Sequence, residues 1–334
     1  MKMNVIGIVL RCLAPALAAL ACAQVQAQQA AWRPERAIEL VAPAGPGGLN
    51  DLMMRSMQNV MQTMKLVDVP LSVSNKSGAG GAVALSYLNQ QQGNPHYLSL
   101  STANMLANHV IGQSALNYTD FTPLGHLMHT YIAFAVKPDS TMSSGKEMLA
   151  RLRKDPGSIS ISVGTSLGNA SHVALALTAK SAGADPRKLR TVVFKSAGEA
   201  LAALFGGHID MVVSALPNLA RHVEGKTLRV IAVAAPERVG GTFSETPSLR
   251  ELGTTVVVST WRGAMGPRGL QSAHIAYWET LVGRIVDSEE WGKELAREFA
   301  TRTRMSAAEN RDFLAAEYKS YHTVLSELGM AKSK

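Results

Sequence analysis

The sequence predicts an α/β protein of two domains, and three observations support this fold class. Short runs of Val, Ile and Leu alternate with amphipathic stretches along most of the chain. Several of the amphipathic stretches begin with a helix-capping sequence. The 334-residue chain also remains long enough for two domains once an N-terminal targeting segment is removed. We therefore expect mainly parallel sheets flanked by helices.

Residues 1–27 are predicted to be a signal peptide. Two basic residues precede an apolar run, residues 12–21, which is too short to span a bilayer. Small-x-small sequences that suit a signal peptidase end at Ala23 and Ala27. The alternative interpretation is a lipoprotein anchored through Cys22. Both interpretations describe an exported protein, and we expect it in the periplasm.

The composition argues against several classes of function. The formal net charge is +8, but the basic residues are scattered and only 5% of residues are aromatic, so we expect no nucleic-acid interface. Both cysteines lie in the predicted signal peptide, which leaves the mature chain without disulfide or thiol chemistry. No P-loop sequence is present, and we expect no cofactor. The basic surplus suits a small anionic ligand.

Nine short segments rich in Val, Ile and Leu are typical of the buried strands of parallel sheets. In chain order they are Ile38–Val41, Leu71–Ser74, Tyr97–Ser101, Ile132–Val136, Ile159–Val163, Thr191–Phe194, Met211–Val213, Arg229–Ala234 and Val256–Val258.

Helices are predicted between these segments. From Leu49 to Met64, apolar residues recur at three- and four-residue steps, and the methionines among them are expected to fill the core. Capping boxes, in which a Ser and a Glu three residues later satisfy each other's backbone N–H groups, predict further helix starts. These are at Ser144, Ser196, Ser248 and Ser306.

Three junctions between a predicted strand and a predicted helix share a small, Gly-rich or hydroxylated composition: residues 42–51, 164–172 and 195–199. Each leads to a helix N-terminus, where free N–H groups and the positive end of the helix dipole favour an anion. In open α/β sheets such junctions gather beyond the carboxyl ends of the strands. The three loops are therefore predicted to form an anion-binding site.

The order and spacing of short motifs resemble those of the Bug-type (TctC-like) solute-binding proteins of tripartite tricarboxylate transport systems. The motifs include Pro43-x-x-Pro46-Gly47-Gly48-x-x-Asp51, Asn75-Lys76-x-Gly78-Ala79-Gly80-Gly81, Lys195-Ser196-Ala197-Gly198-Glu199, Leu204-x-Gly206-Gly207-x-x-Asp210 and Trp261-x-Gly263-x-x-Gly266-Pro267. The resemblance covers nearly the whole mature chain.

The resemblance implies a two-lobed periplasmic-binding-protein (Venus flytrap) fold. Lobe 1 would comprise residues 28–129 and 258–334, and lobe 2 would comprise residues 130–257. It further implies a monomer without catalytic or metal-binding residues. This monomer would capture a small carboxylate between the lobes and deliver it to the membrane subunits of a tripartite tricarboxylate-type transporter. The same fold could instead present its ligand to a membrane sensor, and the sequence leaves these two partners open.

The matching positions imply a pocket gripped mainly by backbone amides, hydroxyls and water, with Lys195 as the main basic side chain. Apolar Ala215 stands where the family often has a polar or acidic residue, and Ala44 replaces an aromatic one. The implied ligand-binding residues are Ala44, Gly45, Gly47, Gly48, Asn50, Thr102, Asn104, Thr165, Ser166, Gly168, Ser171, His172, Lys195, Ser196, Gly198, Ser214 and Ala215.

A serine hydrolase is the alternative from a different functional class. Residues 164–168 read G-x-S-x-G with Ser166 as the nucleophile, and Asp210 and then His222 or His274 follow in hydrolase order. Against it, residues 169–171 are predicted to be a further loop and N-cap, whereas a nucleophile elbow starts its helix at the nucleophile. Hydrolysis is therefore kept only as the alternative.

Overall fold

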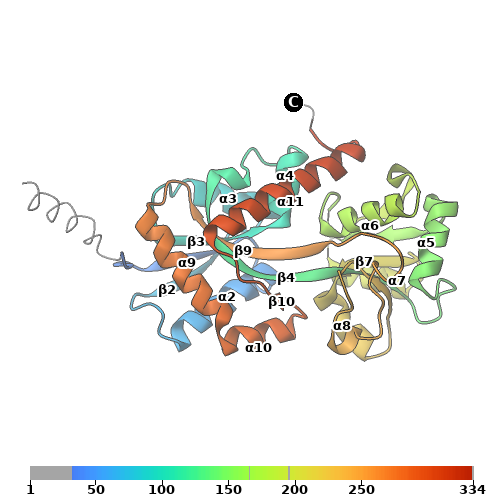
Figure 1. Cartoon of the computed structure of the whole chain (residues 1–334), viewed down its shortest axis with the longest axis horizontal. Helices are drawn as coiled ribbons and strands as arrows, with labels where there is room; N and C mark the ends of the chain where they lie inside the picture. Colours follow the sequence, from blue (N-terminus) through green and yellow to red (C-terminus); the bar gives the residue numbers. More distant parts are fainter. Residues whose placement is uncertain (1–31, 165, 195, 333–334) are drawn as a thin grey trace, which may run out of the picture.

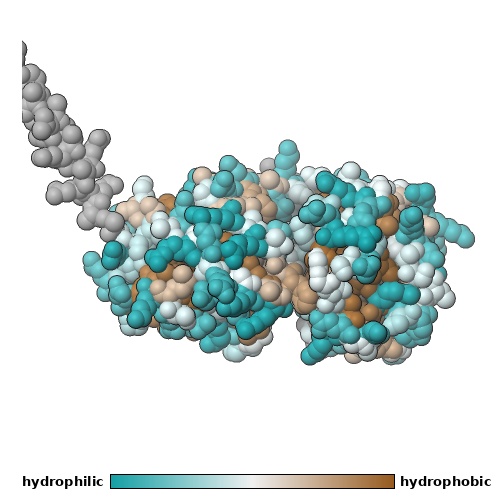
Figure 2. Space-filling model, turned by 60° about the horizontal axis from the view of Figure 1, so that its bottom comes forward, coloured by the Kyte–Doolittle hydropathy of each residue, from teal (hydrophilic) through white to brown (hydrophobic). Residues whose placement is uncertain are grey.

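Two long antiparallel strands, β4 (Phe121–Val136) and β9 (Ser259–Pro267), run between two halves of the molecule (Figure 1). The computed structural model describes residues 32–164, 166–194 and 196–332, so the predicted signal peptide and both cysteines lie outside the described residues. We call the paired strands the β4–β9 ribbon. Figure 2 shows the outline of the molecule notched between the two halves, lobe 1 and lobe 2.

Lobe 1 contains both ends of the described chain. Its strands β2, β1 and β3 are parallel, and β3 pairs antiparallel with β9. Its elements are β1 (Ile38–Ala42), α2 (Leu49–Thr63), β2 (Leu71–Asn75), η1 (Ala79–Gly81), α3 (Ala82–Asn89), β3 (Tyr97–Thr102), α4 (Ala103–Val110), η2 (Tyr118–Asp120), α9 (Ser272–Asp287), α10 (Glu289–Arg297), β10 (Thr301–Arg302) and α11 (Ala307–Glu327).

Lobe 2 repeats the plan: β7 pairs antiparallel with β4, and β5 and β6 extend the sheet as parallel neighbours. Its elements are α5 (Gly145–Lys154), η3 (Pro156–Ser158), β5 (Ser160–Ser162), α6 (Ala170–Ser181), η4 (Pro186–Lys188), β6 (Arg190–Val192), α7 (Ala197–Phe205), β7 (Met211–Ala215), α8 (Leu216–Glu224), β8 (Arg229–Val233) and η5 (Gly241–Phe243). The predicted α/β class with helices flanking the sheets is confirmed. The sheets are mixed instead of mainly parallel, because among the residues that the structure describes four parallel strand pairs are joined by five antiparallel pairs that involve β4 or β9.

Each lobe buries apolar side chains on both faces of its sheet. In lobe 1, α2, α9 and α10 cover one face with a core that includes Met57, Trp278 and Trp291, each with no exposed surface. Helices α3, α4 and α11 cover the other face. The buried methionines of α2 confirm that they fill the core rather than present sulfur to a ligand. Within the described residues, no helix combines the length and apolar composition that a membrane-spanning segment needs.

The capping boxes start helices where three of them were predicted. Ser144, Ser196 and Ser306 are the N-caps of α5, α7 and α11, and each side chain accepts a hydrogen bond from the N–H three residues later. Ser248 accepts the same bond from Glu251, but the two residues hold a turn instead of a helix. The box fixes one turn of backbone, and the core decides whether a helix continues.

The β4–β9 ribbon is where the strand prediction is wrong. Val256–Val258 is not a strand, because within it only Val258 makes backbone hydrogen bonds to neighbouring segments. Strand β9 begins at the next residue. The first eleven residues of β4 were not predicted. Its pattern is interrupted by Pro123 and by Gly125, and the pairing with β9 shifts register between these two residues and again between His126 and Met128. Bulges of this kind break the alternation by which a strand is recognised.

Candidate ligand-binding site

Strands β3 and β7 point toward each other from opposite lobes. At the end of β3, Thr102 pairs with Arg262 of β9, which in turn pairs with Met128 of β4. At the end of β7, Ala215 pairs with Ile132 of β4. Met128 and Ile132 are four residues apart on one strand, which is about 13 Å at the usual rise per residue. The carboxyl ends of the two strands therefore meet over the middle of the β4–β9 ribbon.

Three helices that each follow a strand begin without side-chain caps: α2 after β1, α4 after β3 and α8 after β7. The N-cap residues of α2, α4 and α8 are Gly48, Thr102 and Ala215, and none accepts a hydrogen bond through its side chain. The N–H groups of a first helical turn lack intrahelical partners, so here they remain available to a ligand, except at Pro217 of α8, which has no N–H. Two of these helix ends belong to lobe 1 and one to lobe 2, and together they give the site donors from both sides.

In contrast, α6 and α7 are capped by the protein itself. Asn169 accepts a hydrogen bond from the His172 N–H at 3.0 Å, and Ser196 accepts one from the Glu199 N–H at 3.1 Å. One donor at each of these helix ends is therefore already occupied. The sequence predicted anion donors at both loops; the structure assigns the freer ends to α2, α4 and α8.

The loop between β1 and α2 is organised by Asp51. Its carboxylate accepts hydrogen bonds from the Gly47 N–H at 2.8 Å, from Asn75 at 2.8 Å and from Arg55 at 3.1 Å. The Arg55 bond is the largest effect that lowers the pKa of Asp51, to about 2, so the carboxylate is charged at any physiological pH. The predicted site residues Ala44, Gly45, Gly47, Gly48 and Asn50 all lie on this loop or the first turn of α2, partly or fully exposed.

The loop between β5 and α6 packs against lobe 1. The Gly168 N–H donates to Nδ1 of His172 at 2.9 Å, and a Cβ at Gly168 would lie 3.4 Å from Leu325 of α11. Ser166 is half-buried, whereas Ser171 is buried within the first turn of α6. Burial lowers the pKa of His172 to about 4, so its ring is neutral and can accept the Gly168 bond. The Gly168 N–H is thus used within the loop itself.

The remaining predicted residues lie at the ends of β3, β6 and β7. Asn104 is half-buried in the first turn of α4, and Gly198 is exposed in the first turn of α7. The hydroxyl of Ser214 is buried and accepts a hydrogen bond from Asn218 at 2.9 Å. Thr165 and Lys195 lie outside the described residues. The topology therefore gathers the described members of the predicted set at the strand ends that face the ribbon.

Sequence reasoning missed Arg262, in the middle of the ribbon. Its guanidinium donates to Asn50 at 2.6 Å, to Thr260 at 3.1 Å and to the Trp261 carbonyl at 2.8 Å. The residue was visible as the variable position of the Trp261-x-Gly263 motif, but only loops were searched for basic side chains. Its place beside Asn50 and Thr102 depends on strand pairing, which the motif does not encode.

The hydrolase constellation is not assembled in the part of the chain that the structure describes. Asp210 accepts hydrogen bonds from the Ser160 N–H at 2.7 Å and the Ser160 hydroxyl at 2.6 Å, at the start of β5. Ser166 lies beyond the opposite end of that short strand. His222 contacts Thr227 at the end of α8, and His274 lies in α9 of lobe 1. Helix α6 begins at Ala170, after the serine instead of at it.

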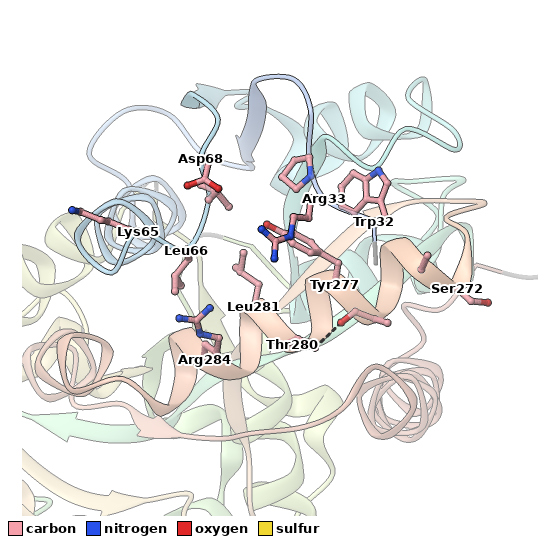
Figure 3. A pocket seen from close by; sticks show the side chains of 14 residues that line it. Trp32, Arg33, Lys65, Leu66, Asp68, Ser272, Tyr277, Thr280, Leu281 and Arg284 are labelled. Atoms are coloured by element: carbon pink, nitrogen blue, oxygen red, sulfur yellow. Dashed lines mark hydrogen bonds between the residues drawn. The ribbon is translucent and has the colours of Figure 1, made fainter. Parts of the chain in front are cut away.

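A cavity of about 740 Å³ lies elsewhere in lobe 1, where Tyr277, Leu281 and Arg284 project from α9 toward the segment 65–68 (Figure 3). Residues 32–34 complete its wall. These segments precede β1 and β2, so the cavity sits at the amino ends of the strands, away from the predicted site. Ligands of open α/β sheets bind at the carboxyl ends, and we assign the cavity no part in the site.

Comparison with known proteins gives consistent matches. The sequence model of a family described as "Tripartite tricarboxylate transporter family receptor" matches residues 53–330. Protein BugT of Bordetella pertussis is 24% identical over 301 residues, which cover 89% of this chain and 90% of that protein. A UPF0065 protein encoded in the gbd 5' region of Cupriavidus necator is 25% identical over 326 residues, 96% of this chain and 97% of the relative.

Solved structures share the fold. MatC from Rhodopseudomonas palustris with bound malate superposes with a TM-score of 0.72 at 21% identity, covering 87% of this chain and 99% of that one. Another R. palustris protein, solved with adipate, gives a TM-score of 0.76 at 21% identity, covering 89% and 99%. The two-lobed fold is thereby established.

Proposed function

The chain belongs to the tripartite tricarboxylate transporter receptor family, and from that premise we propose that it captures a small carboxylate between its lobes. It is a solute-binding receptor of a tripartite transporter. The observation that supports a carboxylate ligand is that uncapped helix N-termini from both lobes lie near one another, α2 and α4 on one side and α8 on the other. Such ends bind anions through N–H groups and the helix dipole.

Two structural neighbours support the ligand class, since one was solved with malate and the other with adipate. The lobes that hold the ligand are proposed to be residues 28–129 with 258–334, and residues 130–257. The site is proposed to comprise the residues implied by the sequence: Ala44, Gly45, Gly47, Gly48, Asn50, Thr102, Asn104, Thr165, Ser166, Gly168, Ser171, His172, Lys195, Ser196, Gly198, Ser214 and Ala215.

Capture works by closure. A carboxylate that accepts hydrogen bonds from both lobes is more stable in the closed arrangement than in the open one, and this difference shifts the equilibrium toward closure. The closed protein is then the form that the membrane subunits recognise. We further propose that the protein is exported to the periplasm, works as a monomer and catalyses no reaction.

A thermal-shift screen of the mature protein against mono-, di- and tricarboxylates, malate and adipate included, tests the carboxylate. A ligand that binds only the folded state raises the melting temperature, by a free energy of about 2.7 kcal/mol at a hundredfold excess over Kd. If no carboxylate raises the melting temperature, the proposal is wrong.

Two glycine variants locate the site. A Cβ at Gly47 meets no atom within 4 Å, but φ is 76°, so Gly47→Val both adds a branched side chain and strains the backbone of the α2 loop by about 1–3 kcal/mol. We expect it to remain folded and to lose binding. Gly168→Val would instead push against Leu325, so we expect it to lower the stability of the fold before any effect on binding can be measured. Normal binding by Gly47→Val would remove the α2 loop from the site.

The absence of catalysis is tested at Ser166. A fluorophosphonate probe should leave this residue unlabelled, because no described histidine or carboxylate is positioned to activate it. Stoichiometric labelling that disappears in Ser166→Ala would favour a hydrolase.

A further inference from the structure

Arg262 is a buried cation without an anionic partner. Only 8% of its surface is exposed, and its three hydrogen bonds go to neutral oxygens of Asn50, Thr260 and Trp261. Among the described residues, no carboxylate oxygen lies within 4.0 Å of the guanidinium. Burial lowers the pKa of Arg262 to about 10, although the carboxylate of Glu298 acts against this. A buried charge without a counter-charge destabilises the protein, and a bound anion offsets this cost.

Arg262 lies beside two of the uncapped helix starts of lobe 1, those of α2 and α4. It is the strand partner of Thr102, the N-cap of α4. Its Nε donates to the side chain of Asn50, in the first turn of α2. Within the described residues, its second terminal nitrogen, Nη2, makes no hydrogen bond. The guanidinium therefore lies beside the uncapped N-termini of both α2 and α4, and its Nη2 remains free to donate to a ligand.

We propose that Arg262, together with the N-terminal amides of α2 and α4, binds one carboxylate of a dicarboxylate ligand in lobe 1. The second carboxylate is bound by the N-terminus of α8 in lobe 2. This inference rests on the proposed function and adds to it the ligand class and the residue that selects it. A monocarboxylate can satisfy only one of the two sites, so it leaves either the guanidinium or the α8 amides unpaired.

A purely structural role for Arg262 has a different signature. The Asn50 bond could serve only to fasten α2 to the ribbon, in which case loss of the guanidinium lowers stability and affects every ligand alike. A ligand-binding role instead changes the ratio of affinities for dicarboxylates and monocarboxylates. This ratio is the quantity to measure.

Calorimetry with malate, adipate and butyrate on the mature protein and its variants tests the inference. Arg262→Gln should raise Kd for malate or adipate at least about tenfold, as expected for loss of a charge-assisted hydrogen bond. The rise should be smaller for butyrate, because its single carboxylate can bind the α8 amides instead. Arg262→Lys, which keeps the charge but not the planar fork, should recover part of the affinity. Arg229→Gln is the matched control. Arg229 is partly buried, but its Nη2 donates to the Ser140 carbonyl in lobe 2, so the Kd values of this variant should equal those of wild type.

Glu298→Gln provides a test that leaves Arg262 in place. It removes the carboxylate that opposes an anion at the guanidinium, so Kd for dicarboxylates should fall about two- to threefold. If wild type binds malate or adipate and Arg262→Gln binds them equally well, the inference is wrong while the proposed function stands. An equal loss for all three ligands also overturns it. If wild type binds no carboxylate, the proposed function itself fails, and this inference with it.

Discussion

Asp51 shows how a single buried side chain can shape a loop of the proposed site. It is 2% exposed, and its oxygens hold the Gly47 N–H, the Asn75 amide and the Arg55 guanidinium in fixed positions. The Asn75 amide also donates to the Ala44 carbonyl at 3.0 Å, which ties the loop to the end of β2. At this scale the site depends on buried groups whose charge states are set by their neighbours.

Asp51→Ala should lower the free energy of unfolding by about 2–3 kcal/mol, because it removes several charge-assisted hydrogen bonds. The pKa of Asp51 falls from 3.8 to about 2 on folding, so its contribution is complete above pH 4 and is lost as the pH falls toward 2. Urea unfolding between pH 2 and pH 5 measures both effects. Unchanged stability of the variant at pH 5 would show that the hydrogen bonds contribute nothing net.

His172 predicts a loss of stability at mildly acidic pH. Its pKa falls from 6.5 to about 4 because burial disfavours the charged ring. Between pH 6.5 and pH 4 the unfolded chain therefore binds a proton that the folded chain does not bind. Stability therefore falls as the pH decreases from 6.5 to 4. His172→Asn can still accept the Gly168 bond but does not titrate, and the pH slope of the unfolding free energy should fall by up to about 1.4 kcal/mol per pH unit.

His126 is the control for this experiment. Burial lowers its pKa to about 4 as well, yet it lies against Trp261 and Phe313, away from the loop. Chemical denaturation at several pH values should give similar slopes for His126→Asn and His172→Asn. Only the His172 variant changes a group beside the proposed site. A wild-type stability that is flat between pH 6.5 and 4 would contradict both assignments.

At the scale of the element, the helix starts divide into two kinds. Helices α5, α6, α7, α10 and α11 are closed by their own Ser or Asn side chains, whereas α2, α3, α4 and α8 are not. A capped start stabilises the fold, and an uncapped one leaves donors for a ligand at some cost to stability. Of these uncapped helices, α2, α4 and α8 directly follow β1, β3 and β7, the strands whose ends lead to the proposed site, whereas α3 follows η1.

Two polar residues at the start of α6, Asn169 and Ser171, have different roles. Asn169 caps the helix and also donates to the Val163 carbonyl at 2.8 Å, so Asn169→Ala should cost about 1–2 kcal/mol. The sequence suggested a cap near Ser171, but this residue lies inside the helix. Ser171→Ala should change the unfolding free energy by less than about 0.5 kcal/mol. Denaturant midpoints of the two variants decide between the assignments, and a larger effect at Ser171 would contradict ours.

At the scale of the whole molecule, the lobes touch on both faces of the ribbon. On one face, Val173 and Ala176 of α6 share an apolar cluster with Leu325 of α11. On the other face, the rings of Phe243 and Phe299 lie 5.3 Å apart. Opening of the lobes must separate at least one of these contacts. The lobes are therefore coupled by packing as well as by the two strands that connect them.

Leu325→Ala should lower the unfolding free energy by about 2–5 kcal/mol and resolve a single calorimetric transition into two, because it empties the shared cluster. Leu295→Ala is the matched control, since Leu295 is equally buried but belongs to a core within lobe 1. It should lower stability without separating the transitions. Two transitions already present in wild type would show that the lobes are not coupled.

Local signals in the sequence determined the elements that depend on neighbouring residues. The alternation of strands and helices, and the caps at Ser144, Ser196 and Ser306, follow from interactions within one or two turns. Gly-rich strand–helix junctions likewise indicated the loops of the site, because a parallel strand followed by a helix always places its loop at the carboxyl edge of the sheet.

Tertiary structure decided what depends on residues far apart in the chain. The long strand β4 is hidden by Pro123 and Gly125 and forms because β9 pairs with it across two bulges. Arg262 lies 212 residues from Asn50, yet strand pairing brings their side chains to 2.6 Å. No local pattern encodes such a contact, because it results from burial and register of the whole sheet. For the same reason, the sequence indicated the loops of the proposed site but not where the buried charge between them lies.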